Sequence, residues 1–169
     1  PDLRSFFPNK AYVGADMREG PGVDAVLNLH SVDLPTGSVG TVLLMDTLEH
    51  VEVFGRALEE VRRILRQDGV LVMSSVMNFP IHAYPCDYWR FTPDAFRSLL
   101  APFADHYVTA LGRQDFPHTV VGVGFKSPVP DDIMLPFEAE ADRWSRRWQW
   151  RIFTGWKEWV RRLTPPILI

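Results

Sequence analysis

The sequence predicts an α/β fold in which a mostly parallel sheet ends in an antiparallel pair of strands. Several short stretches are continuously apolar, which is typical of strands that are covered on both faces, as in parallel sheets. Stretches with helical spacing lie between the later strands. Beyond residue 104, two strand-like stretches follow one another with only a short link. Alternation followed by such a hairpin indicates an α/β sheet with an antiparallel edge.

Four apolar stretches are predicted to be the parallel strands, namely residues 10–16, 24–29, 40–46 and 70–76. Between the last two, apolar residues recur at helical spacing, at Phe54, Leu58, Val61 and Leu65. Gly69 follows them, as expected just beyond the C-terminus of a helix. The pattern therefore predicts a helix that ends shortly before Gly69 and a strand that begins directly after it.

A second helix is predicted from Thr92 to about Leu100. The Thr92 hydroxyl suits a helix cap, Pro93 suits the first turn, and Asp94 lies beside the positive end of the helix dipole. Two strands are expected after this helix, over residues 105–112 and 118–126. The short link between them contains Pro117 and directly follows Gly112, which favours an antiparallel pair.

Composition and length indicate one globular domain. The chain has 169 residues, of which 46% are hydrophobic and 23% charged, so widespread disorder is not expected. Cys86 is the single cysteine, which excludes an internal disulfide framework and a cysteine-built zinc site. A lone cysteine fits a reducing compartment, and we expect a cytoplasmic protein. No apolar stretch is long enough for a predicted membrane-spanning helix.

The chain divides into three predicted parts. Residues 1–127 form the α/β domain, residues 128–137 a proline-rich linker, and residues 138–169 a basic, tryptophan-rich helical tail. From residue 143 onward the chain carries six Arg and one Lys against one Glu, a balance of +6, so the rest carries −9. Five of the six tryptophans also lie in this tail. Such an asymmetry indicates a partner for the tail.

On a helical wheel, most tryptophans of the tail fall on one half and most arginines on the other. We expect this amphipathic helix to pack on the domain or on a second copy of the chain. Peripheral association with a membrane surface through residues 143–169 is the alternative, because basic helices rich in Trp bind there. Nucleic acid is the least favoured partner, since the acidic body would repel phosphate.

Candidate cofactor-binding residues stand where predicted strands end, which is where open α/β sheets bind ligands. Asp16, followed by Met17, ends the first strand, and an acid there can accept hydrogen bonds from both ribose hydroxyls of a nucleotide. The alternative is an ordinary turn residue. The second strand ends at Asn28 and Leu29, and the third at Met45 and Asp46, which complete the candidate set.

Candidate catalytic residues lie in the connections that follow the third and fourth strands. The long aromatic loop after residue 76 contains His82, a candidate general base, and Asp87. The alternative for His82 is a solvated loop residue. His50 lies in a Leu-Glu-His segment that can line a pocket, unless Glu49 merely caps a helix and His50 packs at the surface. The sequence predicts no metal site.

Five segments in order resemble the Rossmann-like S-adenosylmethionine-dependent methyltransferases of the type 11 group. They are Tyr12 to Asp16, Asp33 to Ser38, Leu48 to Val51, Ala57 to Leu71, and Asp87 to Pro93. The resemblance implies S-adenosylmethionine as the cofactor. It further implies that Asp16 holds the ribose, that Asn28 and Leu29 flank the adenine, and that Met45 and Asp46 lie near the methionine part. Asp16 alone suits a nicotinamide cofactor equally well.

The resemblance also implies a reversed last strand. It further implies a first strand and a glycine-rich turn, and neither of these is found in the sequence. We expect an N-terminally incomplete version of a longer enzyme. The alternative is that the flanking strands close up and the cofactor site is degenerate. The expected function is methyl transfer to a small-molecule, sugar or lipid acceptor. His82 or Asp87 is the expected base, and His50 is the less favoured candidate. The rival is a methyltransferase-like binding module that reaches a membrane or protein partner through its tail.

Overall fold

Four strands form the central sheet of the computed structural model, which describes residues 3–82 and 85–163, with side chains up to residue 149. The strands are β3 (Val39–Met45), β4 (Leu65–Val76), β5 (Asp105–Gly112) and β6 (Pro117–Phe125), in the spatial order β3-β4-β6-β5. β3 and β4 are parallel, whereas β6 runs antiparallel to both β4 and β5. The predicted antiparallel pair and the reversed last strand are therefore confirmed.

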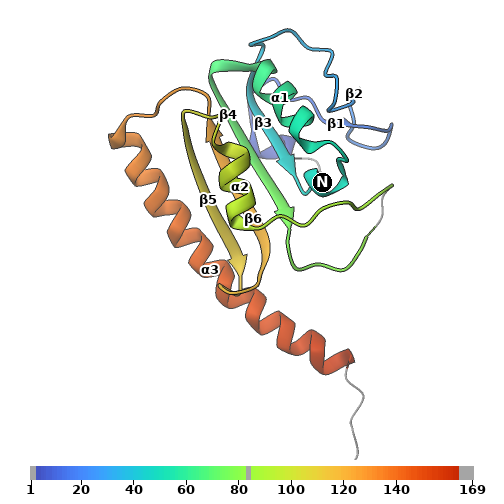
Figure 1. Ribbon diagram of the computed structural model, residues 1–169, viewed down its shortest axis with the longest axis vertical. Helices are drawn as coiled ribbons and strands as arrows, with labels where there is room; N and C mark the ends of the chain where they lie inside the picture. Colours follow the sequence, from blue (N-terminus) through green and yellow to red (C-terminus); the bar gives the residue numbers. More distant parts are fainter. Residues whose placement is uncertain (1–2, 83–84, 164–169) are drawn as a thin grey trace, which may run out of the picture.

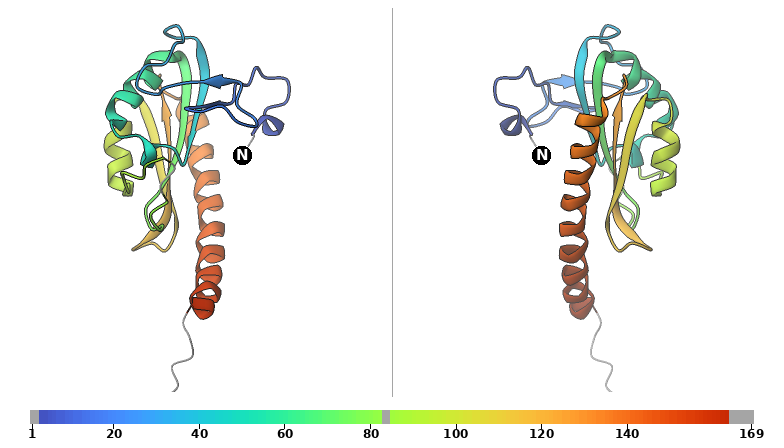
Figure 2. Two further views of the ribbon diagram at one scale, coloured as in Figure 1. Left: turned by 90° about the vertical axis from the view of Figure 1, so that its right-hand side faces the viewer. Right: turned by 90° about the vertical axis from the view of Figure 1, so that its left-hand side faces the viewer.

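Helices cover both faces of this sheet (Figures 1 and 2). α1 (Phe54–Ile64) and α2 (Pro93–Leu100) lie on one face, and α3 (Asp131–Leu163) runs along the other. Two short 3-10 helices complete the described elements, η1 (Arg4–Phe6) and η2 (Leu48–His50). The core lies between the sheet, α1 and α2, and its most buried members are Leu48, Val61, Leu65, Leu71, Met73, Phe96, Leu100 and Val120.

Gly122 allows α2 to lie close against β6. A Cβ atom at this position would stand 2.8 Å from Leu100 Cδ1 and 3.0 Å from Phe96 Cδ2, both closer than normal packing. Replacing Gly122 with valine is therefore expected to lower the free energy of unfolding by about 1–3 kcal/mol, the usual cost of overpacking. Gly55→Ala in α1 is the matched control, since no atom lies within 4 Å of its new Cβ. Urea denaturation should show a lower free energy of unfolding for Gly122→Val and no decrease for Gly55→Ala.

β4 begins earlier than predicted. Leu65 is already extended, with φ −61° and ψ 136°, and pairs with Val39 of β3 directly after α1 ends. The pairing is irregular between this residue and Val70, which pairs with Thr41. Gly69 therefore lies inside the strand and is not the residue that follows the helix. Buried Leu65 is the last residue of the helical pattern and the first of the strand, so the periodicity alone places the boundary wrongly.

The first two predicted strands do not join the central sheet. β1 (Ala15–Asp16) and β2 (Ala25–Val26) are much shorter than expected and form a separate parallel pair. Figure 2 shows this pair and the N-terminal segment to one side of the main sheet. The prediction of one continuous sheet is wrong for these strands. The alternative that the strands flanking the missing one close up is also wrong, because β1 and β3 belong to different sheets.

A partly buried ion pair between Glu60 and Arg63 ties the segment after β2 to α1. Glu60 accepts hydrogen bonds from the Val32 amide (3.0 Å) and from Arg63 Nη2 (2.9 Å). Arg63 also donates to the carbonyl oxygens of Val32 and Leu34, each at 2.8 Å. These bonds position the chain that runs from β2 to β3.

Protonation of Glu60 is expected to loosen this segment in acid. The bonds from Arg63 and from the Val32 amide lower the pKa of Glu60 from 4.5 to about 2. A lowered carboxyl pKa adds stability above the unfolded value of 4.5, and this stability is lost as the pH falls from there through about 2. Hydrogen exchange at the Val32 amide should therefore accelerate in this window, relative to the other core amides. Glu60→Gln should remove this dependence, and an unchanged pH profile would contradict the assignment.

α3 begins inside the segment predicted as a linker. The helix starts at Asp131, so residues 131–137 of the predicted 128–137 linker are helical, including Pro136. Two acids in the first turn favour a helix start there, and the prolines obscured this signal. Phe137 anchors the helix, with its ring 5.6 Å from that of Tyr107 and 5.7 Å from that of Phe125.

The tail thus packs on the domain over its first part. α3 lies along β5, and Tyr107 Oη donates to Asp142 Oδ1 at 2.5 Å. The predicted tryptophan and arginine halves depend on side chains beyond residue 149, which lie outside the described residues, as do residues 164–169. Within the described part of the chain, no helix is both long and apolar enough to cross a membrane.

Candidate functional site

Two connections meet at the carboxyl edge of the central sheet. β3 and β4 are parallel neighbours, with Met45 opposite Ser74, so the chain leaves both strands at the same edge. The first connection contains η2 with Glu49 and His50. The second is the long loop that runs beyond the ends of the strands towards α2 (Figure 1). These two connections supply a cluster of polar side chains.

Glu49 is a fully buried acid of this cluster, with an exposed fraction of 0%. Its Oε2 accepts a hydrogen bond from Ser75 Oγ at 2.8 Å, and its backbone carbonyl accepts one from the Tyr88 amide at 2.7 Å. Among the described residues, its Oε1 has no hydrogen-bond partner. The interpretation of Glu49 as a helix cap is therefore wrong, because its carboxylate points to β4. The helical pattern of the sequence contains no signal for this contact.

His50 and His82 face one another from the two connections. Their ring centroids are 4.9 Å apart. Nδ1 of His50 lies 2.6 Å from the Cys86 carbonyl oxygen. Nδ1 of His82 lies 3.1 Å from the Pro80 carbonyl oxygen and 3.2 Å from Asp87 Oδ2. Carbonyl and carboxylate oxygens only accept hydrogen bonds, so each neutral ring carries its proton on Nδ1 and leaves the lone pair of Nε2 free.

Asp87 is the anchor of the long loop. Its side chain is 1% exposed and is held by Arg90, through Nη1 at 2.5 Å and Nη2 at 2.7 Å, and by the His82 amide at 2.8 Å. The Arg90 guanidinium and the His82 amide hold the pKa of Asp87 well below its ordinary value. Asp87 therefore stays ionised and orients His82. The structure thus brings the three predicted catalytic residues together.

Sequence reasoning missed Ser75 and Arg90. Arg90 follows Asp87 by three residues, and an acid and a base at that spacing in one loop were the available signal. Ser75 lies within a predicted buried strand, and the sequence contains no signal that marks it as a functional residue. Ser75 holds Glu49 in place, and Arg90 holds Asp87.

The predicted cofactor residues fall into two groups. Met45 and Asp46 lie at the carboxyl edge of the central sheet, where the backbone of Asp46 has φ +48°. Ser74 Oγ donates to Asp46 Oδ1 at 2.8 Å, which fixes this turn. The second group, namely Asp16, Met17, Asn28 and Leu29, lies on or just after the separate β1–β2 pair.

The second group is mostly exposed. Asp16 Oδ1 accepts a hydrogen bond from the Arg18 amide at 3.0 Å, and Asn28 Oδ1 accepts one from the His30 amide at 2.9 Å. Met17 is 57% exposed, whereas Leu29 packs against the hydrophobic core. Both polar side chains thus make local turn bonds and retain exposed surface for a ligand.

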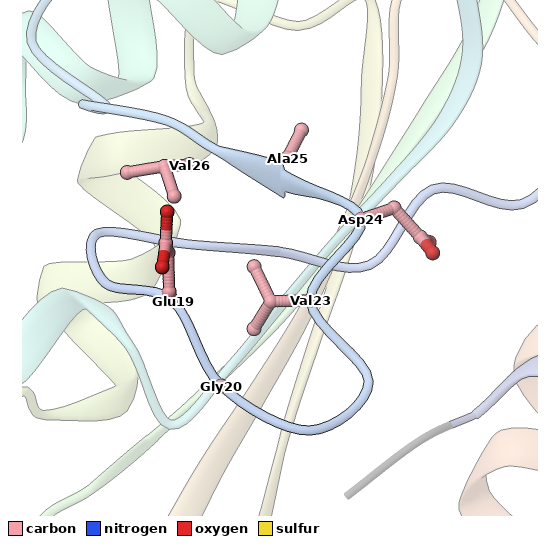
Figure 3. A pocket seen from close by; sticks show the side chains of 6 residues that line it. All are labelled: Glu19, Gly20, Val23, Asp24, Ala25 and Val26. Atoms are coloured by element: carbon pink, nitrogen blue, oxygen red, sulfur yellow. The ribbon is translucent and has the colours of Figure 1, made fainter.

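A hollow of about 420 Å³ lies beside the β1–β2 pair (Figure 3). Its lining residues are Glu19, Gly20, Val23, Asp24, Ala25 and Val26. Asp24 is engaged there by Arg4 Nη2 at 2.5 Å and by the Gly14 amide at 2.8 Å. None of the predicted site residues lines this hollow, although Asp16 of β1 pairs with Val26, which does.

The family model described as a methyltransferase domain matches residues 10–73. This stretch contains every residue predicted to bind the cofactor, together with Glu49 and His50. The match confirms the resemblance to the type 11 methyltransferase group. The observed sheet agrees with the α/β fold that this resemblance implies. No curated protein matches the sequence.

Solved structures share this fold. A 1,6-didemethyltoxoflavin-N1-methyltransferase from Burkholderia thailandensis has a TM-score of 0.52 and 19% identity, over 68% of this chain and 60% of that chain. It was crystallised with 1,6-didemethyltoxoflavin and S-adenosylhomocysteine. A protein from Pyrococcus horikoshii has a TM-score of 0.51 and 13% identity, over 68% of this chain and 71% of that one.

A third structure, a methyltransferase from Thermotoga maritima described as a possible histamine N-methyltransferase, has a TM-score of 0.49 and 20% identity. That alignment covers 59% of this chain and 61% of that chain. The chain thus spans about 60% of the length of the Burkholderia and Thermotoga proteins. The likeness to the Burkholderia and Pyrococcus structures shows the fold.

Proposed function

We propose that the protein transfers a methyl group from S-adenosylmethionine to a small-molecule acceptor. The match of residues 10–73 to the methyltransferase domain family carries this proposal. The reversed strand β6 and the polar cluster at the carboxyl edge of β3 and β4 support it, because ligands of open α/β sheets bind at that edge.

In this proposal the two groups of candidate residues hold different parts of the cofactor. Asp16 accepts hydrogen bonds from the ribose hydroxyls, with Met17 beside it, and Asn28 and Leu29 flank the adenine. Met45 and Asp46 lie near the methionine part. The sulfonium methyl is already electrophilic, so the chief task of the protein is to align the acceptor with the S–CH3 bond.

The cluster of Glu49, His50 and His82 faces the acceptor in this proposal. Where the acceptor must lose a proton, Nε2 of His82 receives it in this proposal, and Asp87, 3.2 Å from Nδ1, keeps the ring in the required tautomer. Phe79 stacks edge-on against His82 at 4.9 Å and is 41% exposed, while Tyr88 is 44% exposed. These aromatic surfaces favour an acceptor with a ring or another apolar part, including sugars and lipids with such a part.

Formation of S-adenosylhomocysteine tests this proposal. The protein would be incubated with S-adenosylmethionine and pools of phenols, aromatic amines, sugars and lipid headgroup analogues. Acceptor-dependent formation of S-adenosylhomocysteine is expected for one pool. Absence of both turnover and cofactor binding would favour the rival function, a binding module without catalysis.

A further inference from the structure

The side chains of Glu49, His50 and His82 form a set of metal-ligand atoms. One such atom from each residue lies within 4.8 Å of those of the other two. Ligand atoms around a tetrahedral ion stand about 3.4 Å apart, given metal–nitrogen bonds of about 2.1 Å. The three side chains therefore need to close by less than about 1 Å each to share an ion. From this geometry we propose that the three residues bind a divalent transition-metal ion.

Hydrogen bonds hold all three side chains of the cluster in place. Nδ1 of His50 is engaged by the Cys86 carbonyl, and Nδ1 of His82 by Pro80 and Asp87. Each imidazole thus offers its Nε2 lone pair. Metal-bound histidines typically donate their other nitrogen to a carboxylate or a carbonyl, which fixes the tautomer and raises the basicity of the ligand. The cluster shows this outer arrangement for both rings.

Glu49 supplies an independent observation. Its carboxylate is fully buried, and only Oε2 has a partner, Ser75 Oγ, among the described residues. A buried oxygen without a partner is costly, because it has lost its hydration and gained nothing in exchange. A cation bound at Oε1 would satisfy it. Arg90 does not serve this purpose, since its guanidinium is bonded to Asp87 and to the carbonyls of Pro80 and Trp89.

The charges and donor types select the kind of ion. Glu49 and Asp87 against Arg90 leave one net negative charge around two neutral imidazoles, which favours a cation. Two nitrogen ligands and one carboxylate suit zinc and its first-row neighbours rather than magnesium or calcium, which prefer oxygen. His82 is 34% exposed at its side chain, so the ion would reach solvent on one side. Three protein ligands leave a coordination position for water or an oxygen-bearing ligand.

Metal binding here does not depend on the proposed methyl transfer. With the ion bound, His50 and His82 serve as ligands. An acceptor would then bind at the open coordination position of the ion and would not contact Nε2 of His82. The sequence predicted no metal site because His82 is remote from Glu49 and His50 in the chain. The parallel pairing of β3 with β4 brings their connections together.

Titration of the metal-free protein with Zn²⁺ by calorimetry, and with Co²⁺ by visible absorption, tests the site. One ion per chain is expected, and Co²⁺ should show the absorption bands of nitrogen and oxygen ligation. His82→Ala and Glu49→Gln should each weaken binding at least about 100-fold, and Asp87→Asn about 10–100-fold, as outer-shell changes do. Thermal melts would verify that each variant folds. If Glu49→Gln does not fold, His82→Ala still tests the site, because His82 lies on a partly exposed loop.

Two control variants make the result specific. His106→Ala removes an exposed histidine of β5 outside the cluster, and Cys86→Ser removes the one thiol while it keeps the backbone carbonyl that His50 contacts. Both should bind the ion as the unmodified chain does. The proposal would be overturned by absence of stoichiometric binding, by unchanged affinity in a folded His82→Ala variant, or by loss of binding in Cys86→Ser. All of these outcomes are read without any methyl acceptor.

Discussion

Replacing Asp16 with alanine is expected to weaken S-adenosylmethionine binding at least about 100-fold. In the proposed site this carboxylate accepts hydrogen bonds from both ribose hydroxyls, and hydrogen bonds to a charged group contribute about 1.5–3 kcal/mol each. The residue ends β1, and its backbone carbonyl accepts a bond from the Leu27 amide that the substitution leaves in place. The effect should therefore appear in binding, measured by calorimetry, and not in the melting temperature.

The control for this variant is Asp68→Ala. Asp68 lies near the opposite, amino-terminal end of the β3–β4 pair, and its side chain is 80% exposed. Removing its charge alters the net charge of the protein as much as the Asp16 variant does. Equal affinity of the Asp16 variant and this control would refute the ribose-binding role, whichever cofactor the protein uses.

Replacing His82 with alanine is expected to lower kcat about 100- to 10,000-fold, the usual range for a residue that handles a proton in the reaction. S-adenosylmethionine affinity should stay unchanged, because His82 is not among the candidate cofactor-binding residues. The loss is expected whether His82 receives the proton itself or holds the proposed ion. Single-turnover kinetics with a saturating acceptor would measure it.

Asp87→Asn distinguishes a positioning role from a catalytic one. The amide keeps the size of the side chain but loses the charge that pairs with Arg90 and fixes the His82 tautomer. We expect a smaller loss of kcat than for His82→Ala. Full kcat in a His82 variant would show that the cluster takes no part in the reaction. A larger loss of kcat for Asp87→Asn than for His82→Ala would mean that Asp87 is the catalytic residue and His82 the positioning one.

The fold was largely predictable because its signals are local. Thr92 caps α2 as expected, since its Oγ1 accepts a hydrogen bond from the Ala95 amide at 3.1 Å, and Pro93 opens the helix. The apolar stretches around residues 40–46 and 70–76 become β3 and β4. Errors arose where one residue serves two elements, as at Leu65, or where prolines obscure a helix start, as at Asp131.

The site was predictable only in part, because its contacts are tertiary. His50, His82 and Asp87 were selected as separate residues at the ends of strands, and the structure brings them together. The partners that define their states, the Cys86 carbonyl and Arg90, depend on the path of the loop. The buried position of Glu49 follows from the packing of η2 against β4, which no periodicity reveals.

Calorimetric titration with S-adenosylmethionine tests the central claim most directly. It would be run on this chain and on an N-terminally extended form, because the chain spans only about 60% of the length of the Burkholderia protein. Saturable binding by the longer form, abolished in its Asp16→Ala variant, is the predicted result. Binding by neither form would contradict the account and direct attention to the basic tail and a role without catalysis.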